Sequence, residues 1–119
     1  GLENPPIFVP SVARYKQGMI VQVPIHLSKN LGVVSSPQKI HDILSQHYDG
    51  SKFITVNPLD TAQGLVEISP EKHNHSNMLE INVFSNKAAT QCLLTATFDN
   101  LGKGASRAAI QSISLMLDL

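Results

Sequence analysis

Residues 78–98 read MLEINVFSNKAATQCLLTATF, and this stretch decides the fold. Over 78–84 apolar and polar side chains alternate, which is the period of a half-buried strand. Residues 90–98 are rich in β-branched and apolar side chains and indicate a second, longer strand. The short polar connection at Asn86 and Lys87 suits a hairpin, so we expect the two strands to be antiparallel neighbours.

Upstream of this hairpin the chain also favours extended structure. Residues 19–27 place apolar side chains at the odd positions and predict the clearest strand in the sequence. Pro24 lacks a main-chain donor, which places this strand at an edge, or the proline at a bulge or at a donor that faces away from its neighbour. Residues 7–12 begin extended because Pro10 forbids a helix there, and a turn or bulge follows at 15–18.

Two segments predict helices. At 35–37 two serines precede a proline, which suits a capped helix start. One apolar stripe follows over about three turns, at Ile40, Ile43, Leu44 and Tyr48. Residues 103–117 predict a second, unusually apolar helix.

The remaining segments complete an α+β pattern. Residues 53–56 and 65–68 indicate short strands, and 69–77 indicate a polar, flexible loop. The order of elements predicts an α+β fold with a largely antiparallel or mixed sheet. At 119 residues the chain is expected to form a single domain over 1–119.

Composition excludes several classes of function. Nine basic and nine acidic side chains give a net charge of zero, so we expect no nucleic-acid partner, which would need a concentrated basic surface. The uninterrupted apolar runs, such as the one at 115–117, are far too short to cross a membrane. The lone cysteine, Cys92, cannot form an internal disulfide, so we expect a reducing cytoplasm and a buried apolar role for it.

The histidines raise the question of a metal site. His73 and His75 form an HxH pair, which places both rings on one face of a strand. A zinc site needs two further ligands, and the only nearby carboxylates are Glu71 and Glu80. A solvated loop is therefore the preferred interpretation, and no metal site is predicted.

The junction at 98–107 has a different character. Gly102 and Gly104 punctuate the turn between a strand and the apolar helix, so the backbone there can approach another molecule. The helix start offers unpaired N–H groups, and Lys103 adds a positive charge for a phosphate. The alternative is a tight turn that merely packs a helix of small residues against the sheet.

Two stretches resemble one enzyme family. DNLGKGAS at 99–106, with AIQ at 109–111 and LM at 115–116, resembles the closing motif DNLxKGAsxxAvQxxxLM of the N-acetyl-gamma-glutamyl-phosphate reductases. FVP at 8–10 and QGMI at 17–20 resemble that family's FxPHLxPMxRGI segment. The Asn-x-x-Lys-Gly-Ala core of the first motif is shared more loosely with aspartate-semialdehyde dehydrogenases. The similarity spans nearly the whole chain but only the C-terminal third of such an enzyme.

The resemblance implies a domain like the C-terminal domain of glyceraldehyde-3-phosphate dehydrogenase, with helices packed on one face of the sheet. In that family a separate Rossmann domain binds NADP and supplies the catalytic cysteine. The second domain forms a homodimer through its sheet, and the enzyme converts N-acetyl-glutamyl phosphate to N-acetyl-glutamate semialdehyde in arginine biosynthesis. The family also uses a histidine as a base. Since this chain contains no dinucleotide-binding turn, no motif for the catalytic cysteine and no motif for the histidine base, we expect a fragment that is inactive alone and holds no catalytic residue.

The family's cofactor residues carry over to four positions. Asn100 matches the asparagine that reaches the nicotinamide carboxamide. Lys103, Gly104 and Ala105 match the turn that closes over the cofactor. The resemblance therefore implies a cofactor-binding role for these four residues.

The sequence differs from the family motif at two positions, and two other functions are considered for the chain. Ser11 stands where the family has a histidine, and Gln17 where it has an arginine, so no substrate contact is carried over to either position. The chain is alternatively a non-catalytic dimerisation or small-ligand-binding module, or a domain of an aspartate-semialdehyde dehydrogenase.

Overall fold

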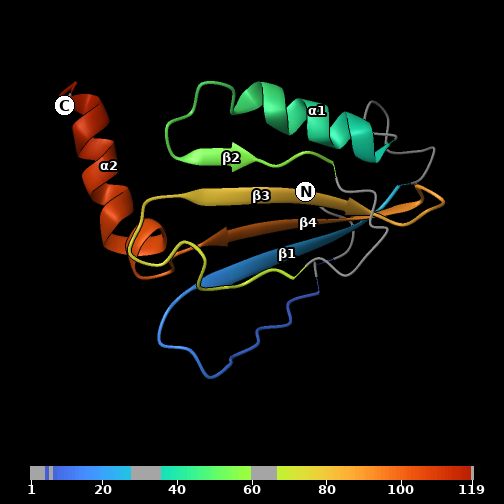
Figure 1. Ribbon diagram of the computed structural model, residues 1–119, viewed down its shortest axis with the longest axis horizontal. Coiled ribbons are helices and arrows are strands. Elements are labelled where there is room, and N and C mark those ends of the chain that lie inside the picture. The colour runs from blue at the N-terminus through green and yellow to red at the C-terminus, as the bar shows by residue number, and fades with distance from the viewer. Residues whose placement is uncertain (1–4, 6, 28–35, 60–66, 119) are drawn as a thin grey trace.

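One four-stranded sheet organises the molecule, a computed structural model that describes residues 5, 7–27, 36–59 and 67–118 (Figure 1). The strands are β1 (Met19–His26), β2 (Ile54–Val56), β3 (Leu79–Ser85) and β4 (Gln91–Phe98), in the spatial order β1-β4-β3-β2. The helices are α1 (Pro37–His47) and α2 (Arg107–Met116), with a π-helical turn, η1 (Gly102–Ser106), before α2. β4 pairs antiparallel with β1 and β3, while β2 runs parallel to β3. The predicted α+β class with a mixed, largely antiparallel sheet is confirmed.

The β3–β4 hairpin forms where the sequence predicts it. Asn86 Oδ1 accepts the N–H groups of Thr90 and Gln91 at 2.9 and 3.2 Å. Ala89 adopts a φ of +50°, the left-handed conformation that closes the turn. The asparagine side chain therefore supplies the acceptor that fixes the hairpin's register.

Strand β1 lies at an edge of the sheet, which is one of the three placements that Pro24 allows. The Leu27 N–H donates to the Thr90 carbonyl at 2.8 Å, so the odd-numbered N–H groups of this strand face β4. Position 24 therefore turns its missing donor to the free edge, where it removes a hydrogen-bonding site from the edge of the sheet.

One face of the sheet is apolar and is partly covered by α1. Ile40 of α1 forms the buried core with Val83 and Cys92, and Ile25 packs against this cluster. The predicted cap is present, because Ser36 Oγ accepts the Lys39 N–H at 3.1 Å. Helix α1 packs against β2 and β3, so the β1 side of the same apolar face remains open.

The opposite face is polar and is covered at one end by residues 67–77. Thr97 is completely buried there, and Glu80, its partner across the ladder, contacts Lys72 and His73 of this loop. Residues 69–77 form the polar loop that the sequence predicts, and its side chains and main chain also contact Glu80, Gln17 and Asp99. The strand expected at 65–68 lies partly outside the described residues, and its described positions, 67 and 68, are not in a strand.

The C-terminal helix departs from the prediction in its start and its position. Residues 102–106 form the π-helical turn, in which Ala105 has a non-helical φ of −144° and ψ of −111°, so regular α-helix begins only at Arg107. Of the two helices, α1 packs against the sheet, whereas α2 projects from the sheet's end (Figure 1). Its apolar side chains are largely exposed, and they include Ile110, Ile113, Leu115 and Met116.

Candidate functional site at the junction of β4 and α2

The buried carboxylate of Asp99 organises the junction. Its Oδ1 accepts the N–H groups of Leu101 and Gly102 at 2.9 and 3.0 Å. Its Oδ2 accepts the His75 N–H at 2.8 Å and the Gln17 side-chain amide at 3.2 Å. One side chain therefore joins three segments that are far apart in the sequence.

The charge of Asp99 is favoured although the side chain is only 2% exposed. Burial acts to raise its pKa, but the N–H groups of His75, Gly102 and Leu101, and the charge of Arg107, outweigh burial and lower the pKa below its ordinary value of 3.8. Asp99 is thus an anion held by the protein's own donors. This internal carboxylate uses the N–H groups of Leu101 and Gly102, and the binding of a phosphate at the same turn stays a prediction.

Asn100 is fixed by the segment that leads into β1. Its Oδ1 accepts the Gly18 N–H at 2.8 Å. Gly18 has a φ of +111°, and a Cβ there would lie 2.9 Å from the carbonyl carbon of Pro70. Among the described residues, Asn100 Nδ2 has no hydrogen-bond acceptor. The side chain is thus oriented through its oxygen and keeps its amide donor available.

Gln17, at the family's arginine position, belongs to the same network. It is 9% exposed, and its Nε2 lies 3.3 Å from Nδ1 of His75 as well as donating to Asp99. Asn74 donates from Nδ2 to the Gln17 carbonyl at 3.1 Å. The glutamine therefore helps to hold the loop at 67–77 against the junction.

The glycines of η1 allow close packing of the turn. A Cβ at Gly102 would lie 2.8 Å from Asp99 Oδ2, and one at Gly104 would lie 3.0 Å from the ring of Phe98. The Gly104 N–H donates to the Asp99 carbonyl at 2.9 Å. Gly104 and Ala105 nevertheless lie at the surface, so the outer side of this turn is accessible.

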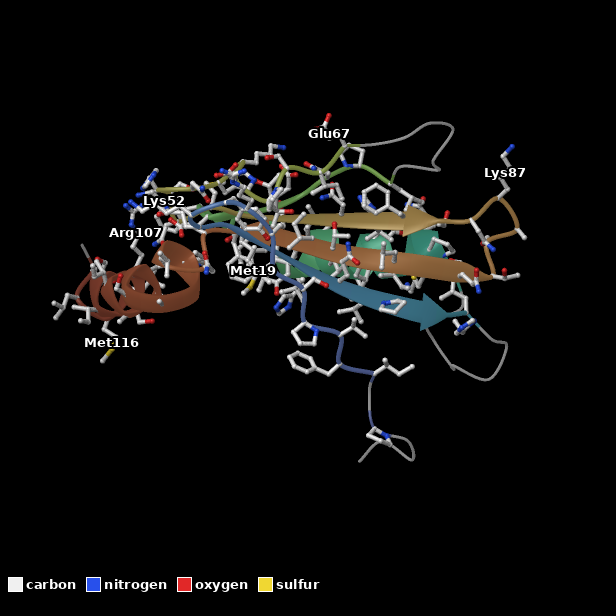
Figure 2. The ribbon with its side chains drawn as sticks, turned by 90° about the horizontal axis from the view of Figure 1, so that it is seen from below. Met19, Lys52, Glu67, Lys87, Arg107 and Met116 are labelled. Atoms are coloured by element: carbon white, nitrogen blue, oxygen red, sulfur yellow. The ribbon has the colours of Figure 1, made fainter. Side chains whose placement is uncertain are left out.

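Lys103 reaches from η1 to a cleft beside α2. Its Nζ donates to Gln111 Oε1 at 2.6 Å, and Asn77 Nδ2 donates to the same oxygen at 3.2 Å. The ammonium also lies 5.9 Å from the centre of the Phe53 ring. The cleft has a volume of about 500 Å³ and is lined by Lys52, Phe53, Asn77, Gln111 and Ser114, among others. Figure 2 shows Lys52 and Arg107 at this end of the sheet, with Lys87 at the opposite end.

The four residues taken from the family motif therefore lie on one turn. Two of them, Gly104 and Ala105, are exposed, and Asn100 and Lys103 are partly exposed beside them. The cofactor-binding role of all four residues stays a prediction. Sequence reasoning missed Asp99, although an aspartate followed by two residues whose N–H groups it can cap is the signature of a side-chain-stabilised turn.

The other candidate groups have structural contacts. His73 Nε2 lies 3.4 Å from Glu80 Oε2, and Lys72 Nζ lies 2.5 Å from the same oxygen. Burial acts to raise the pKa of Glu80, but Lys72, Asn82 and His73 outweigh it and lower the pKa from 4.5. Cys92 is buried, as predicted, and burial raises the pKa of its thiol. Nowhere in the described ranges do three or more His, Cys, Asp or Glu side chains gather as a metal site would require.

Comparison with known proteins identifies the family of this chain. Residues 1–100 match the family described as semialdehyde dehydrogenase, dimerisation domain. The chain belongs to that family.

Three relatives of this dimerisation domain are similar over 98% of the chain. N-acetyl-gamma-glutamyl-phosphate reductases from Burkholderia ambifaria and Rhizobium leguminosarum bv. trifolii are each 42% identical to it. N-acetyl-gamma-glutamyl-phosphate reductase 2 from Pseudomonas putida is 41% identical. The chain spans 37% of the length of each relative.

Within residues 36–59 and 67–118, both helices fall short of the length and hydropathy that crossing a membrane requires.

Proposed function

We propose that residues 1–119 form one domain, the dimerisation and substrate domain of an N-acetyl-gamma-glutamyl-phosphate reductase. The observation that carries this proposal is the state of Asn100. Its oxygen is fixed by Gly18 while its amide donor stays available, on a turn locked by the buried charge of Asp99. An oriented amide donor suits recognition of a carboxamide oxygen. The names of the relatives support this reductase over an aspartate-semialdehyde dehydrogenase.

The residues at the junction fit a nicotinamide cofactor, for which we propose NADP. In its reduced form, NADPH, the cofactor would supply the hydride that converts the acyl group of N-acetyl-glutamyl phosphate to the aldehyde, with release of inorganic phosphate. Asn100 would orient the carboxamide, while the outer surface of Gly104 and Ala105 would pack beside the ring. Lys103, held by Gln111, would place a positive charge at the edge of the site. We assign no catalytic residue to this chain and place the parent enzyme in the cytoplasm.

The same proposal includes a homodimer formed through the sheet. Met19, Val21 and Val23 of β1 lie on the apolar face that α1 leaves open, and they are 38%, 42% and 47% exposed. Pro24 removes a donor from the free edge of this strand, which favours packing on the face over edge-to-edge extension. A second copy that covers this face would bury apolar surface without leaving main-chain groups unpaired.

The test uses two substitutions at Asn100 in the complete reductase. Asn100→Asp keeps the oxygen that accepts the Gly18 N–H and removes the amide donor, whereas Asn100→Ala removes both. Because orientation of the nicotinamide is lost, we expect kcat to fall about 10²-fold in both variants while cofactor binding changes much less. Steady-state kinetics with NADPH and direct titration of the cofactor measure the two quantities.

The matched control is Asn86→Asp in the hairpin at the far end of the sheet. It makes the same chemical change and keeps the oxygen that caps the turn. We expect its kcat to equal that of the unmodified enzyme. Equal losses of turnover and cofactor affinity at position 100 would instead assign Asn100 a packing role and reject its part in orienting the nicotinamide. A complete protein without reductase activity would reject the proposed function.

A further inference from the structure

The N-terminal arm, defined as residues 7–12, exposes an unusual concentration of apolar side chains. Ile7, Phe8, Val9 and Val12 are 92%, 86%, 75% and 99% exposed, so they make almost no contact with the described part of their own chain. Single exposed apolar residues are ordinary on protein surfaces, but four within six positions form an exposed apolar segment. Such a segment indicates a surface that another molecule covers.

The base of the arm is held firmly. Tyr15 N–H donates to the Ala13 carbonyl at 3.0 Å, and Gln17 and Gly18 are fixed by Asp99 and Asn100. Figure 2 shows the arm leaving the sheet near Met19 and projecting away from it. The arm is thus presented outward from an anchored base.

An apolar surface of matching length lies next to this base. We call Met19, Val21 and Val23 the open β1 row. An extended segment rises about 3.3 Å per residue, so the six residues of the arm span about 20 Å, which is enough to cover this row and its flanks. Pro10 prevents the arm from acting as a regular added strand, and Pro24 removes a donor from the β1 edge. Side-chain packing is therefore the contact that both partners can make.

A second copy of this chain is the occupant that the observations favour. The dimerisation family matches residues 1–100, a range that includes the arm and the open β1 row but excludes α2. The arm and the open β1 row are joined by residues 13–18, and Gln17 and Gly18 of this connection are hydrogen-bonded to Asp99 and Asn100. In an interface with two-fold symmetry, the arm of each copy can reach the row of the other.

We propose that two copies exchange their N-terminal arms, each arm packing its apolar side chains on the open β1 row of the partner. This inference rests on the proposed homodimer, and it assigns the N-terminal arm a direct contact between the two copies. Each dimer then contains two equivalent contacts between an arm and a row.

The test is a mixing experiment with two variants of the whole chain. The arm variant carries Ile7→Ser and Phe8→Ser. The row variant carries Val21→Thr and Val23→Thr, which keep β-branched side chains in the strand. Each variant alone loses both contacts, and we expect its dimer dissociation constant to rise about tenfold. In an equimolar mixture, the heterodimer keeps one intact contact and should dissociate about threefold less readily than either variant homodimer.

Sedimentation equilibrium measures the dissociation constants, and native mass spectrometry separates the three dimers by mass. The control is Ile113→Ser with Leu117→Ser, which removes two exposed apolar side chains from the region outside the family match. We expect this control to dimerise like the unmodified chain. Circular dichroism should give all variants the same spectrum.

Each alternative result has a distinct meaning. An unmodified chain that stays monomeric would overturn both the proposed homodimer and the arm exchange. An unmodified dimer whose dissociation constant is unchanged by the arm substitutions would leave the homodimer standing and overturn the exchange. If both variants dimerise more weakly but the mixed dimer has the same dissociation constant as the variant homodimers, the exchange would also be overturned. In that case each arm packs on its own chain, and an intact arm cannot restore a contact with the intact row of the other chain.

Discussion

The junction around Asp99 and the surface formed by the arm and β1 are opposite in character. At the junction, one carboxylate accepts four hydrogen bonds from three segments within a single chain. On the arm and the open β1 row, apolar side chains lie exposed with few contacts. The candidate cofactor turn is therefore held together within one chain, whereas the arm and the open β1 row are exposed in one chain and, in our proposal, are covered by a second copy.

This difference separates two kinds of substitution. Changes at the junction should alter the free energy of unfolding, because they disrupt contacts that already exist within the chain. Changes on the arm should leave that free energy nearly unchanged and alter association.

The largest loss of stability is expected for Gly18→Ala. A methyl group at this position would meet the Pro70 carbonyl, and the residue would have to adopt a φ of +111°. We expect the free energy of unfolding to fall by about 3 kcal/mol, measured by denaturant titration. Gly50→Ala is the matched control, since Gly50 also has a positive φ, +72°, but nothing lies within 4 Å of the added carbon. Its loss should be about 1 kcal/mol. Equal losses in the two variants would contradict the close packing assigned to Gly18.

A smaller loss is expected for Asp99→Asn. The variant keeps the size of the side chain but removes its charge and turns an NH₂ group toward backbone donors. We expect the free energy of unfolding at neutral pH to fall by about 2 kcal/mol. Asp49→Asn, an exposed position after α1, controls for the chemical change and should have no measurable effect. A stable Asp99→Asn variant would show that the carboxylate does not hold the junction together.

The pH dependence of the same variant sharpens this prediction. The folded protein lowers the pKa of Asp99 from 3.8 and that of Glu80 from 4.5. A lowered pKa contributes stability that is fully present above the ordinary value and is lost as the pH falls through the folded value. The unmodified chain should therefore lose stability on acidification below about pH 4.5, and Asp99→Asn should lose less over the same range. Parallel curves would mean that Asp99 contributes nothing to the acid sensitivity.

The sequence predicted the elements whose signals are local. Alternation identified β1 and β3, the polar turn at Asn86 identified the hairpin, and the serine before Pro37 identified the start of α1. Pro24 limited β1 to three placements, of which the structure shows an edge strand with the proline facing the free edge. Each of these features depends on residues within a few positions of one another, where local side-chain and backbone preferences decide the structure.

The features that the sequence did not predict depend on distant contacts. Asp99 meets Gln17 and His75, which lie 82 and 24 positions away, so no local pattern reveals the network. The loop at 67–77 has the polar composition of a solvent-exposed loop, although some of its polar side chains contact the polar face of the sheet. The regular helix was placed too early because Gly102 and Ala105 suit a helix start as well as the π-helical turn that precedes it.

Sedimentation equilibrium of the unmodified chain at micromolar concentrations tests the central claim most directly. The claim is that a chain with a complete junction still needs a second copy to cover its apolar sheet surface. The account predicts a species of twice the 12.9 kDa chain mass that dissociates on dilution. A particle of 12.9 kDa throughout this concentration range would contradict it.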